Sequence, residues 1–284
     1  MNEASIYTLN NGEKGVEEDR LLYQHNVFLR ITKTMVPKNI KCHLESLGRA
    51  PRIADVGTGT GIWLRDFASE FSSDARLDGY DLDESKFLSS TVLPPNVRLS
   101  SGDLLKPFPQ ELQGQYDLVH ARLLMIALKA DEWEVAAQNL KRLVKPGGYI
   151  LWEELGFPKF TAVPITEAIQ KWNSIDVRHG ISVGRDVTSP MQLERQFRQA
   201  GYVECSHQDH SSFSESADVQ KMAGNLLVNY GRQSLTGIVA RGGFEWLQSH
   251  EDVEEICDQL QAEIDDGTTV MGLEMHWTIG RNPA

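Results

Sequence analysis

Short apolar runs alternate with amphipathic segments along most of the 284-residue chain. The runs are brief and bounded by Gly, Asp, Asn or Pro, which is typical of buried β-strands. Residues 16–35 and 131–144 instead carry apolar side chains at spacings of three and four, which predicts amphipathic helices. The order of these elements indicates an α/β protein. We expect strands at residues 53–56, 76–80, 96–101, 116–120, 149–152, 202–207 and 270–279.

A glycine-rich turn follows the first expected strand. Gly57, Gly59 and Gly61 let the backbone turn tightly and lie against a ligand with no Cβ in the way. A helix is predicted over residues 62–71, so its free N–H groups lie beside this turn. A strand, a glycine turn and a helix in this order bind a nucleotide-like cofactor. A dinucleotide fingerprint has its third glycine one residue later, so the spacing argues against a nicotinamide cofactor.

Carboxylates stand at the ends of the next two expected strands. Asp81 lies 24 positions after Gly57, where a doubly wound fold places an acid that accepts ribose hydroxyls. A helix N-cap is the alternative role for Asp81, but Asp83 suits that role better because it opens the next helical segment. Asp103 follows the third strand, beside Leu104. Asp103 is either a second ligand-binding carboxylate or an ordinary aspartate of a turn.

The fourth and fifth strands end in polar residues as well. His120 falls at the carboxyl end of the fourth strand, and Arg122 is expected to continue into a helix. The helix at 131–144 then ends at a Lys-Pro-Gly-Gly turn, residues 145–148. The fifth strand begins after that turn and ends in Glu153 and Glu154.

The motif Asp-x-Gly-x-Gly-x-Gly at residues 55–61 resembles the first motif of class I S-adenosylmethionine-dependent methyltransferases, and the later strands follow that family's order. The resemblance implies a Rossmann-like fold, with a mostly parallel seven-stranded sheet, an antiparallel C-terminal hairpin and a helical lid. It also implies S-adenosyl-L-methionine as cofactor, with the ribose on Asp81 and the adenine amino group on Asp103. The cofactor-binding residues expected from it are Gly57, Thr58, Gly59, Asp81, Leu82, Asp103, Leu104 and His120.

At finer grain the chain resembles a fungal group of secondary-metabolite methyltransferases. This group includes the gliotoxin-pathway N-methyltransferase type and LaeA-type regulators. The resemblance implies methylation of N or O on an aromatic or peptide-derived natural product. Its pattern is followed at Glu18-Asp19-Arg20-Leu21, Gln24-His25, His120-Ala121-Arg122, Trp152-Glu153-Glu154 and Trp277-Thr278-Ile279-Gly280-Arg281.

A phenol, enol or amide acceptor must lose a proton on methylation, and histidine is the natural base near neutral pH. The catalytic candidates are therefore His25 and His120, with Glu153 third. His25 and Gln24 interrupt an apolar helix face, so either they meet partners in the core or they face the active site.

Substrate residues are expected in segments that the core fold does not need. We expect a helical cap at residues 1–50 and a methyltransferase core at 51–284, with lid insertions at about 156–188 and 209–267. Lids of this kind close a site to water. The aromatic and polar residues of these segments more often pack than bind, but as a group they suit a bulky apolar pocket. The candidate substrate contacts are Tyr7, Gln24, Trp172, Asn173 and Tyr230.

Composition and charge exclude some classes of binding partner. The formal net charge of -12 and the lack of a Lys/Arg cluster argue against a nucleic-acid partner. No apolar signal region and no long apolar run are found, so we expect no membrane span and a cytoplasmic location. Three widely spaced cysteines suit a reducing compartment. We expect no metal at Cys205, His207 and His210, and the sequence leaves the oligomeric state open.

Together these features predict S-adenosylmethionine-dependent methyl transfer to an N or O atom of a small molecule. One alternative is a regulatory protein that binds the cofactor and acts through complex formation. Another is a cyclase or pericyclase that uses the sulfonium only as a fixed positive charge.

Overall fold

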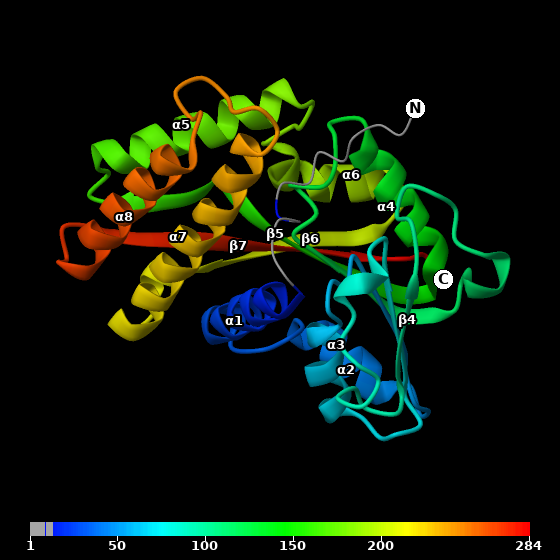
Figure 1. Cartoon of the computed structure of the whole chain (residues 1–284). Coiled ribbons are helices and arrows are strands. Elements are labelled where there is room, and N and C mark those ends of the chain that lie inside the picture. Colours follow the sequence, from blue (N-terminus) through cyan, green and yellow to red (C-terminus); the bar gives the residue numbers. More distant parts are fainter. Residues whose placement is uncertain (1–8, 10–13) are drawn as a thin grey trace.

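The computed structural model describes residues 9 and 14–284, which form a seven-stranded sheet flanked by helices (Figure 1). The strands are β1 (Arg52–Val56), β2 (Arg76–Asp81), β3 (Val97–Ser101), β4 (Tyr116–Arg122), β5 (Val144–Val163), β6 (Val203–Ser211) and β7 (Val270–Arg281). The α-helices are α1 (Lys14–Thr32), α2 (Lys38–Ser46), α3 (Ile62–Phe67), α4 (Glu132–Leu143), α5 (Glu167–Ser182), α6 (Leu193–Gln199), α7 (Ala217–Val239) and α8 (His250–Asp265).

The strands run in the order β3-β2-β1-β4-β5-β7-β6. The five strands from β3 to β5 are parallel to their neighbours, whereas β7 pairs antiparallel with both β5 and β6. The predicted seven-stranded, mostly parallel sheet with an antiparallel C-terminal hairpin is therefore confirmed. The strand order reverses beside β1, so the carboxyl ends of β1 and β4 open a crevice of the kind that binds ligands in such sheets.

Helices bury both faces of the central sheet. Successive side chains of a strand point to opposite faces and therefore pack in different clusters. In β1, Ile53 packs in the cluster that includes α1 to α3, and Ala54 packs in the cluster formed with α4 and α6. In β4, Leu118 and Val119 divide between the same two clusters. The two helix layers lie on opposite sides of the sheet in Figure 1.

β5 and β7 are longer than the sequence predicts. β5 runs from Val144 to Val163, through the expected Lys-Pro-Gly-Gly turn and past Glu154, so the predicted start at Tyr149 and end at Glu153 and Glu154 are both wrong. The left-handed φ of Gly147 and a register shift against β4 absorb the turn as an irregularity within the strand. α5 packs against β5 and α7 packs against β7, and α8 packs on α5 and α7, away from the parallel strands (Figure 1).

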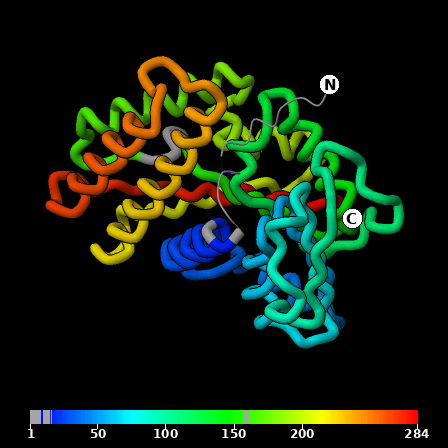
Figure 2. Tube along the Cα trace, viewed as in Figure 1, coloured from blue at the N-terminus to red at the C-terminus, as the bar shows by residue number. Residues whose placement is uncertain are grey.

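Helix α1 crosses from these extra helices to the parallel half of the sheet. It contacts α7 on one side and α3 on the other. Figure 2 shows it in blue between the yellow and orange turns of α7 and the cyan strands. Within residues 9 and 14–284, the helices are all too short or too polar to cross a lipid bilayer.

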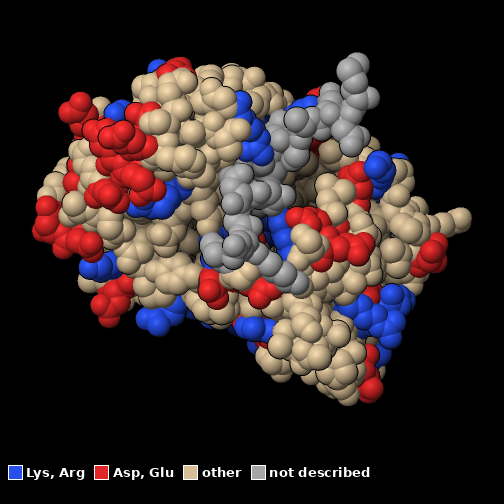
Figure 3. Space-filling model, in the orientation of Figure 1, with Lys and Arg blue, Asp and Glu red and all other residues tan. Residues whose placement is uncertain are grey.

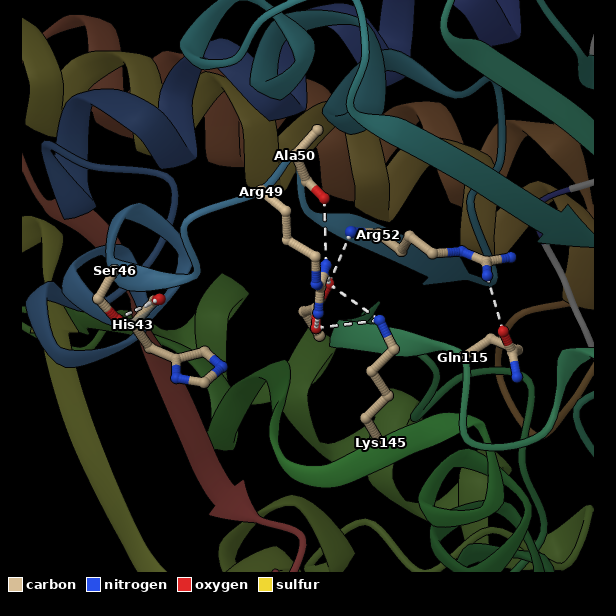
Figure 4. Close-up of polar contacts among 8 residues, drawn as sticks. His43, Ser46, Arg49, Ala50, Arg52, Gln115 and Lys145 are labelled. Carbon is tan, nitrogen blue, oxygen red and sulfur yellow. Dashed lines mark hydrogen bonds and ion pairs between the residues drawn. The ribbon is translucent and has the colours of Figure 1, made fainter.

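A buried carboxylate fixes the amino-terminal edge of the sheet. Asp117, at the start of β4, accepts hydrogen bonds from the Arg49 guanidinium at 2.6 and 2.9 Å and from the Arg52 backbone N–H at 2.8 Å. The Lys145 ammonium lies 3.2 Å away (Figure 4). Burial would raise the pKa of Asp117, but these donors outweigh it, so the pKa is lowered. The carboxylate thus ties β1, β4 and β5 together at the end remote from the crevice.

Asp117→Asn is expected to lower the free energy of unfolding by about 1–2 kcal/mol, discounted because Arg49 is half-exposed. The folded-state pKa lies below the unfolded value, so the stabilisation is present above the unfolded value of about 4 and disappears as pH falls through the folded pKa. Urea unfolding at several pH values measures this, with the exposed Asp74→Asn as the matched control. A pH-independent difference between Asp117→Asn and the wild type would contradict the charge assignment.

Candidate active site

A cavity of about 300 Å³ opens at the carboxyl ends of β1, β2 and β4. The glycine turn after β1 lines it, together with residues of α1 and α7. One part is polar, with Asp55, Asp81 and Asp103 among its lining residues. The other part is apolar, with leucines from α7, β5 and β7. The cavity therefore joins a polar half on the core fold to an apolar half under the extra helices.

The glycine turn has the geometry that the sequence predicts. Gly57, Gly59 and Gly61 all have left-handed φ values, 75°, 57° and 86°, which side chains rarely adopt. The Gly57 and Thr58 N–H groups donate to the Tyr80 carbonyl at 2.8 and 3.0 Å. The Thr58 hydroxyl donates to Asp55 at 2.6 Å. The turn is thus fixed to both β1 and β2 before any ligand arrives.

Asp81 is held at the end of β2 by two backbone donors. Its Oδ2 accepts from the Gly59 N–H at 2.8 Å and its Oδ1 from the Asp83 N–H at 3.0 Å. Burial raises the pKa of Asp81, although these hydrogen bonds oppose the shift. Asp83 caps the following 3₁₀ turn by accepting from the Ser85 N–H at 3.2 Å, as predicted. Asp81 is therefore an oriented carboxylate that lines the cavity.

The other predicted cofactor residues line the same cavity. Leu82 is exposed, whereas Leu104 is buried. Asp103 accepts from the Leu105 N–H at 2.9 Å, and Lys106 lies 2.9 Å from its other oxygen. The alternative of a turn aspartate thus describes part of what Asp103 does, while its side chain remains at the cavity wall. The structure brings together all eight residues of this predicted set.

His120 lies inside a buried chain of charges. Its Nδ1 is 2.7 Å from the Asp55 carboxylate, and its Nε2 is 3.3 Å from that of Glu153. The ring stacks on Trp63, with centroids 3.8 Å apart. Burial would lower the pKa of His120, but the charges of Asp55 and Glu153 outweigh it and the pKa is raised. Both ring nitrogens face carboxylates and the charged form is favoured, which argues against the predicted role of His120 as a base.

Arg122 continues the chain of charges toward α1. Its Nη1 lies 3.9 Å from the Glu153 carboxylate and 3.4 Å from Nδ1 of His25, and its guanidinium lies over the Phe28 ring at 5.6 Å. The other nitrogen of His25 lies 3.2 Å from Asp66. Burial lowers the pKa of His25. A neutral His25 therefore accepts from Arg122 and presents its N–H to Asp66.

Neither His25 nor Glu153 lines the cavity. Both are almost fully buried, and both contact Arg122, which does line it. The prediction that these two residues act directly on the substrate is thus not supported by their positions. Glu154, the second acid of the pair, accepts from the Leu124 N–H and the Trp152 ring N–H and is structural.

The predicted substrate residues divide. Gln24 and Tyr230 line the cavity. Asn173 does not line it, and Trp172 is fully buried against Gly231, so their positions do not support the prediction that these two residues contact the substrate. The expected contact at Tyr7 lies outside the described residues.

Sequence reasoning missed Arg122, Phe28 and the leucines of the apolar half. Arg122 was expected to continue into a helix, but it ends β4, Leu123 adopts a left-handed φ of 56°, and the next helix begins only at Glu132. The His-Ala-Arg motif at the end of the fourth strand contained the available signal. Among the described residues, no group of three His, Cys, Asp or Glu side chains is arranged to hold a metal ion.

The fold and this site define a methyltransferase, and comparisons with known proteins agree. A family model described as a methyltransferase domain matches residues 23–207, so the chain belongs to that family. The methyltransferase grgD of Penicillium sp is 31% identical over 202 residues, 66% of each chain. The N-methyltransferase tcpN of Claviceps purpurea is 29% identical over 190 residues, again 66% of each chain. The chain thus covers slightly under two thirds of these relatives' length.

The expected fungal group is confirmed as well. The secondary metabolism regulator LAE1 of Gibberella fujikuroi is 28% identical over 87% of this chain and 78% of its own. Among solved structures, phosphoethanolamine N-methyltransferase 2 of Haemonchus contortus has a TM-score of 0.55 at 15% identity, covering 99% of this chain and 61% of that one. That structure contains phosphomonomethylethanolamine and S-adenosylhomocysteine. S-adenosyl-L-methionine is therefore the cofactor that the family implies for this chain.

Proposed function

We propose that this protein transfers a methyl group from S-adenosyl-L-methionine to an N or O atom of a small, largely apolar molecule of fungal secondary metabolism. One observation carries the proposal: the glycine turn and the oriented Asp81 share a single cavity with an apolar half under α1 and α7. A donor in the polar half and an acceptor in the apolar half would then meet at the ends of β1 and β4.

The polar half fits the cofactor. The turn at Gly57 and Gly59 leaves backbone close to the ligand, and Asp81 retains free lone pairs on both oxygens for two ribose hydroxyls. Asp103 and Leu104 stand together for an adenine amino group and ring face. We assign cofactor binding to these residues together with Thr58 and Leu82, and we place His120 beneath the site as a positioning residue.

When bound, the cofactor supplies a methyl group already activated by the sulfonium. The protein must then mainly orient the acceptor's lone pair, and orientation can contribute about 7–11 kcal/mol to lowering a barrier. Residues of α1 and α7 line the cavity and, with donor and acceptor bound, would limit the access of water to the reacting atoms. Gln24 and Tyr230 are the polar side chains that we assign to acceptor contact from these helices.

Incubation of the purified protein with methyl-labelled S-adenosylmethionine and a fungal metabolite extract tests the proposal. We expect a product that carries the label and is heavier by one methyl group. Consumption of an extract component without label in the product would instead indicate a cyclase or rearrangement function. Boiled protein and the Asp81→Ala variant serve as controls.

A regulatory role is the second candidate, because regulators of the LAE1 type align over more of the chain than the methyltransferases do. That role predicts a stable complex with another protein and no labelled small molecule. Size-exclusion chromatography of the tagged protein from a fungal extract, run beside the labelling assay, separates the two roles. A labelled metabolite favours the enzyme, and a labelled or co-eluting protein favours the regulator.

A further inference from the structure

Arg122 is a buried guanidinium that its protein partners satisfy only in part. Its side chain is 12% exposed, and a guanidinium keeps its charge at all ordinary pH values. Within the described part of the chain, its polar contacts are made by Nη1 alone, to His25 and Glu153. Nε and Nη2 have no acceptor there. Because Arg122 lines the cavity, these two groups can donate to an oxygen of a ligand there without breaking a bond within the protein.

The Arg and Lys side chains that line the cavity besides Arg122 have other partners. Arg20 donates through Nε and Nη2 to Glu17, at 2.7 and 2.6 Å, and through Nη1 to Gln24 at 2.9 Å. Lys86 lies 3.8 Å from Asp83, beside Asp81 and away from the end of β4. Among the described cavity residues, Arg122 is thus the cation whose fork of donors is left open.

Besides its polar contacts to His25 and Glu153, Arg122 has apolar neighbours. Phe28 lies under its guanidinium, and Leu123 follows it in the chain. The same cavity is lined by leucines from β5, α7 and β7: Leu155, Leu226, Leu227 and Leu273. A charge-assisted hydrogen bond is stronger in such a low-dielectric site than in water. The matching ligand has an apolar body and one negatively charged oxygen.

We propose that Arg122 binds an anionic oxygen of the methyl acceptor. The acceptor is therefore an apolar molecule that carries an oxyanion, such as a carboxylate or phenolate, in its bound form. His25 and Glu153 act as positioning residues, since each contacts the same Nη1 and fixes the guanidinium against Phe28. This inference rests on the proposed methyl-transfer function, because it gives the polar half of the cavity to the cofactor.

The cofactor itself carries a carboxylate, and that group is the other possible source of the oxygen. The acceptor is favoured because the Arg122 guanidinium lies against Phe28 in a cavity that leucines also line, whereas the glycine turn and Asp81 form the polar half. Saturating the protein with S-adenosylhomocysteine, which has the same carboxylate, separates the two sources. The cofactor site is then filled, and an added anionic probe can bind Arg122 only if the S-adenosylhomocysteine carboxylate does not.

The test uses two probes of one shape, 2-naphthoate and 2-naphthamide, with S-adenosylhomocysteine saturating. Their dissociation constants are measured by titration calorimetry on the wild type, Arg122→Met and Arg122→Lys. Arg232→Met is the matched control, because Arg232 on α7 pairs with Glu254 and Asp258 on α8 and does not line the cavity. We expect the wild type and Arg232→Met to prefer naphthoate by about tenfold, as one charge-assisted hydrogen bond provides.

Arg122→Met should bind both probes equally and keep its affinity for S-adenosylhomocysteine within about threefold, while Arg122→Lys keeps part of the preference. Equal binding of the two probes by the wild type would overturn the inference. So would an unchanged preference in Arg122→Met, or a loss of S-adenosylhomocysteine affinity in its place. If Arg122→Met does not fold, Arg122→Gln replaces it. Loss of the whole preference for naphthoate in Arg122→Gln, while Arg122→Lys keeps part of it, supports the inference, and an unchanged preference in Arg122→Gln overturns it. Failure of the wild type to bind S-adenosylhomocysteine would instead refute the proposed function.

Discussion

Replacing His120 with alanine is expected to lower the free energy of unfolding by about 3–5 kcal/mol, the range for breaking a buried ion pair. The ring is fully buried between the carboxylates of Asp55 and Glu153. Its removal leaves two buried anions without the cation between them, and it leaves a cavity beside Trp63. Urea unfolding followed by tryptophan fluorescence measures the loss.

Two further variants establish whether charge is the cause. Adding Glu153→Gln to His120→Ala removes one of the stranded anions, so it should recover part of the lost stability. His207→Ala is the control, because His207 is exposed and pairs with Glu194 at the surface, where such pairs contribute about 0–1 kcal/mol. A loss in His120→Ala as small as that in His207→Ala would refute the account of the buried charge chain.

The wild type and His120→Ala can also be compared as a function of pH. The folded-state pKa of His120 is raised above its unfolded value, so the charged ring contributes its full stabilisation below about pH 6.5, the unfolded value. That stabilisation is lost as pH rises through the folded pKa. The stability difference between wild type and His120→Ala should therefore narrow at alkaline pH. A difference that widens there would mean that the ring is neutral in the folded protein.

The positions of the parallel strands along the chain and the residues of the polar half could be predicted because local sequence marks them. Gly57, Gly59 and Gly61 need left-handed backbone, and Asp81 follows a buried strand at a fixed distance from them. Parallel strands then bring their carboxyl ends to one edge without further information. The structure places this whole set around one cavity, and family membership agrees with the cofactor that it implies.

The apolar half of the cavity could not be predicted, because it depends on contacts between segments that are distant in the sequence. Arg122 contacts His25 from α1 across 97 positions, and nothing local marks that pairing. His25 and His120 were chosen as bases because an unperturbed histidine titrates near neutral pH, but burial lowers the pKa of the first and two carboxylates raise that of the second. Trp172 looked available for substrate, yet its ring fills the space left by Gly231 on α7.

The surface also shows why overall charge says little about the site. Acidic side chains gather over α8 in Figure 3, and they account for much of the net charge of -12. The cavity itself contains both signs, with Asp81 and Asp103 in its polar half and Arg122 in its apolar half. Net charge therefore bears on partners such as nucleic acids, whereas we propose that the acceptor is recognised by one cavity cation, Arg122.

Asp81→Ala is expected to weaken binding of S-adenosylhomocysteine by about tenfold to a hundredfold, because a carboxylate that accepts two ribose hydroxyls contributes about 1.5–3 kcal/mol. The variant also removes the acceptors of the Gly59 and Asp83 N–H groups, which loosens the glycine turn. Titration calorimetry measures the change. Asp83→Ala is the matched control, since Asp83 also lines the cavity but its side chain caps the turn at Ser85.

The pH dependence of binding identifies Asp81 as the group responsible. Its pKa is raised by burial, so in the ligand-free protein this carboxyl gains a proton at a higher pH than an ordinary aspartate. A protonated carboxyl accepts fewer hydrogen bonds, and wild-type affinity for S-adenosylhomocysteine should therefore decline as pH falls toward that pKa. Asp81→Ala should lack this decline while Asp83→Ala retains it. If Asp81→Ala binds S-adenosylhomocysteine within about threefold of the wild type, the loss is below the range for one charged hydrogen bond. That result would refute the assignment of the ribose to Asp81.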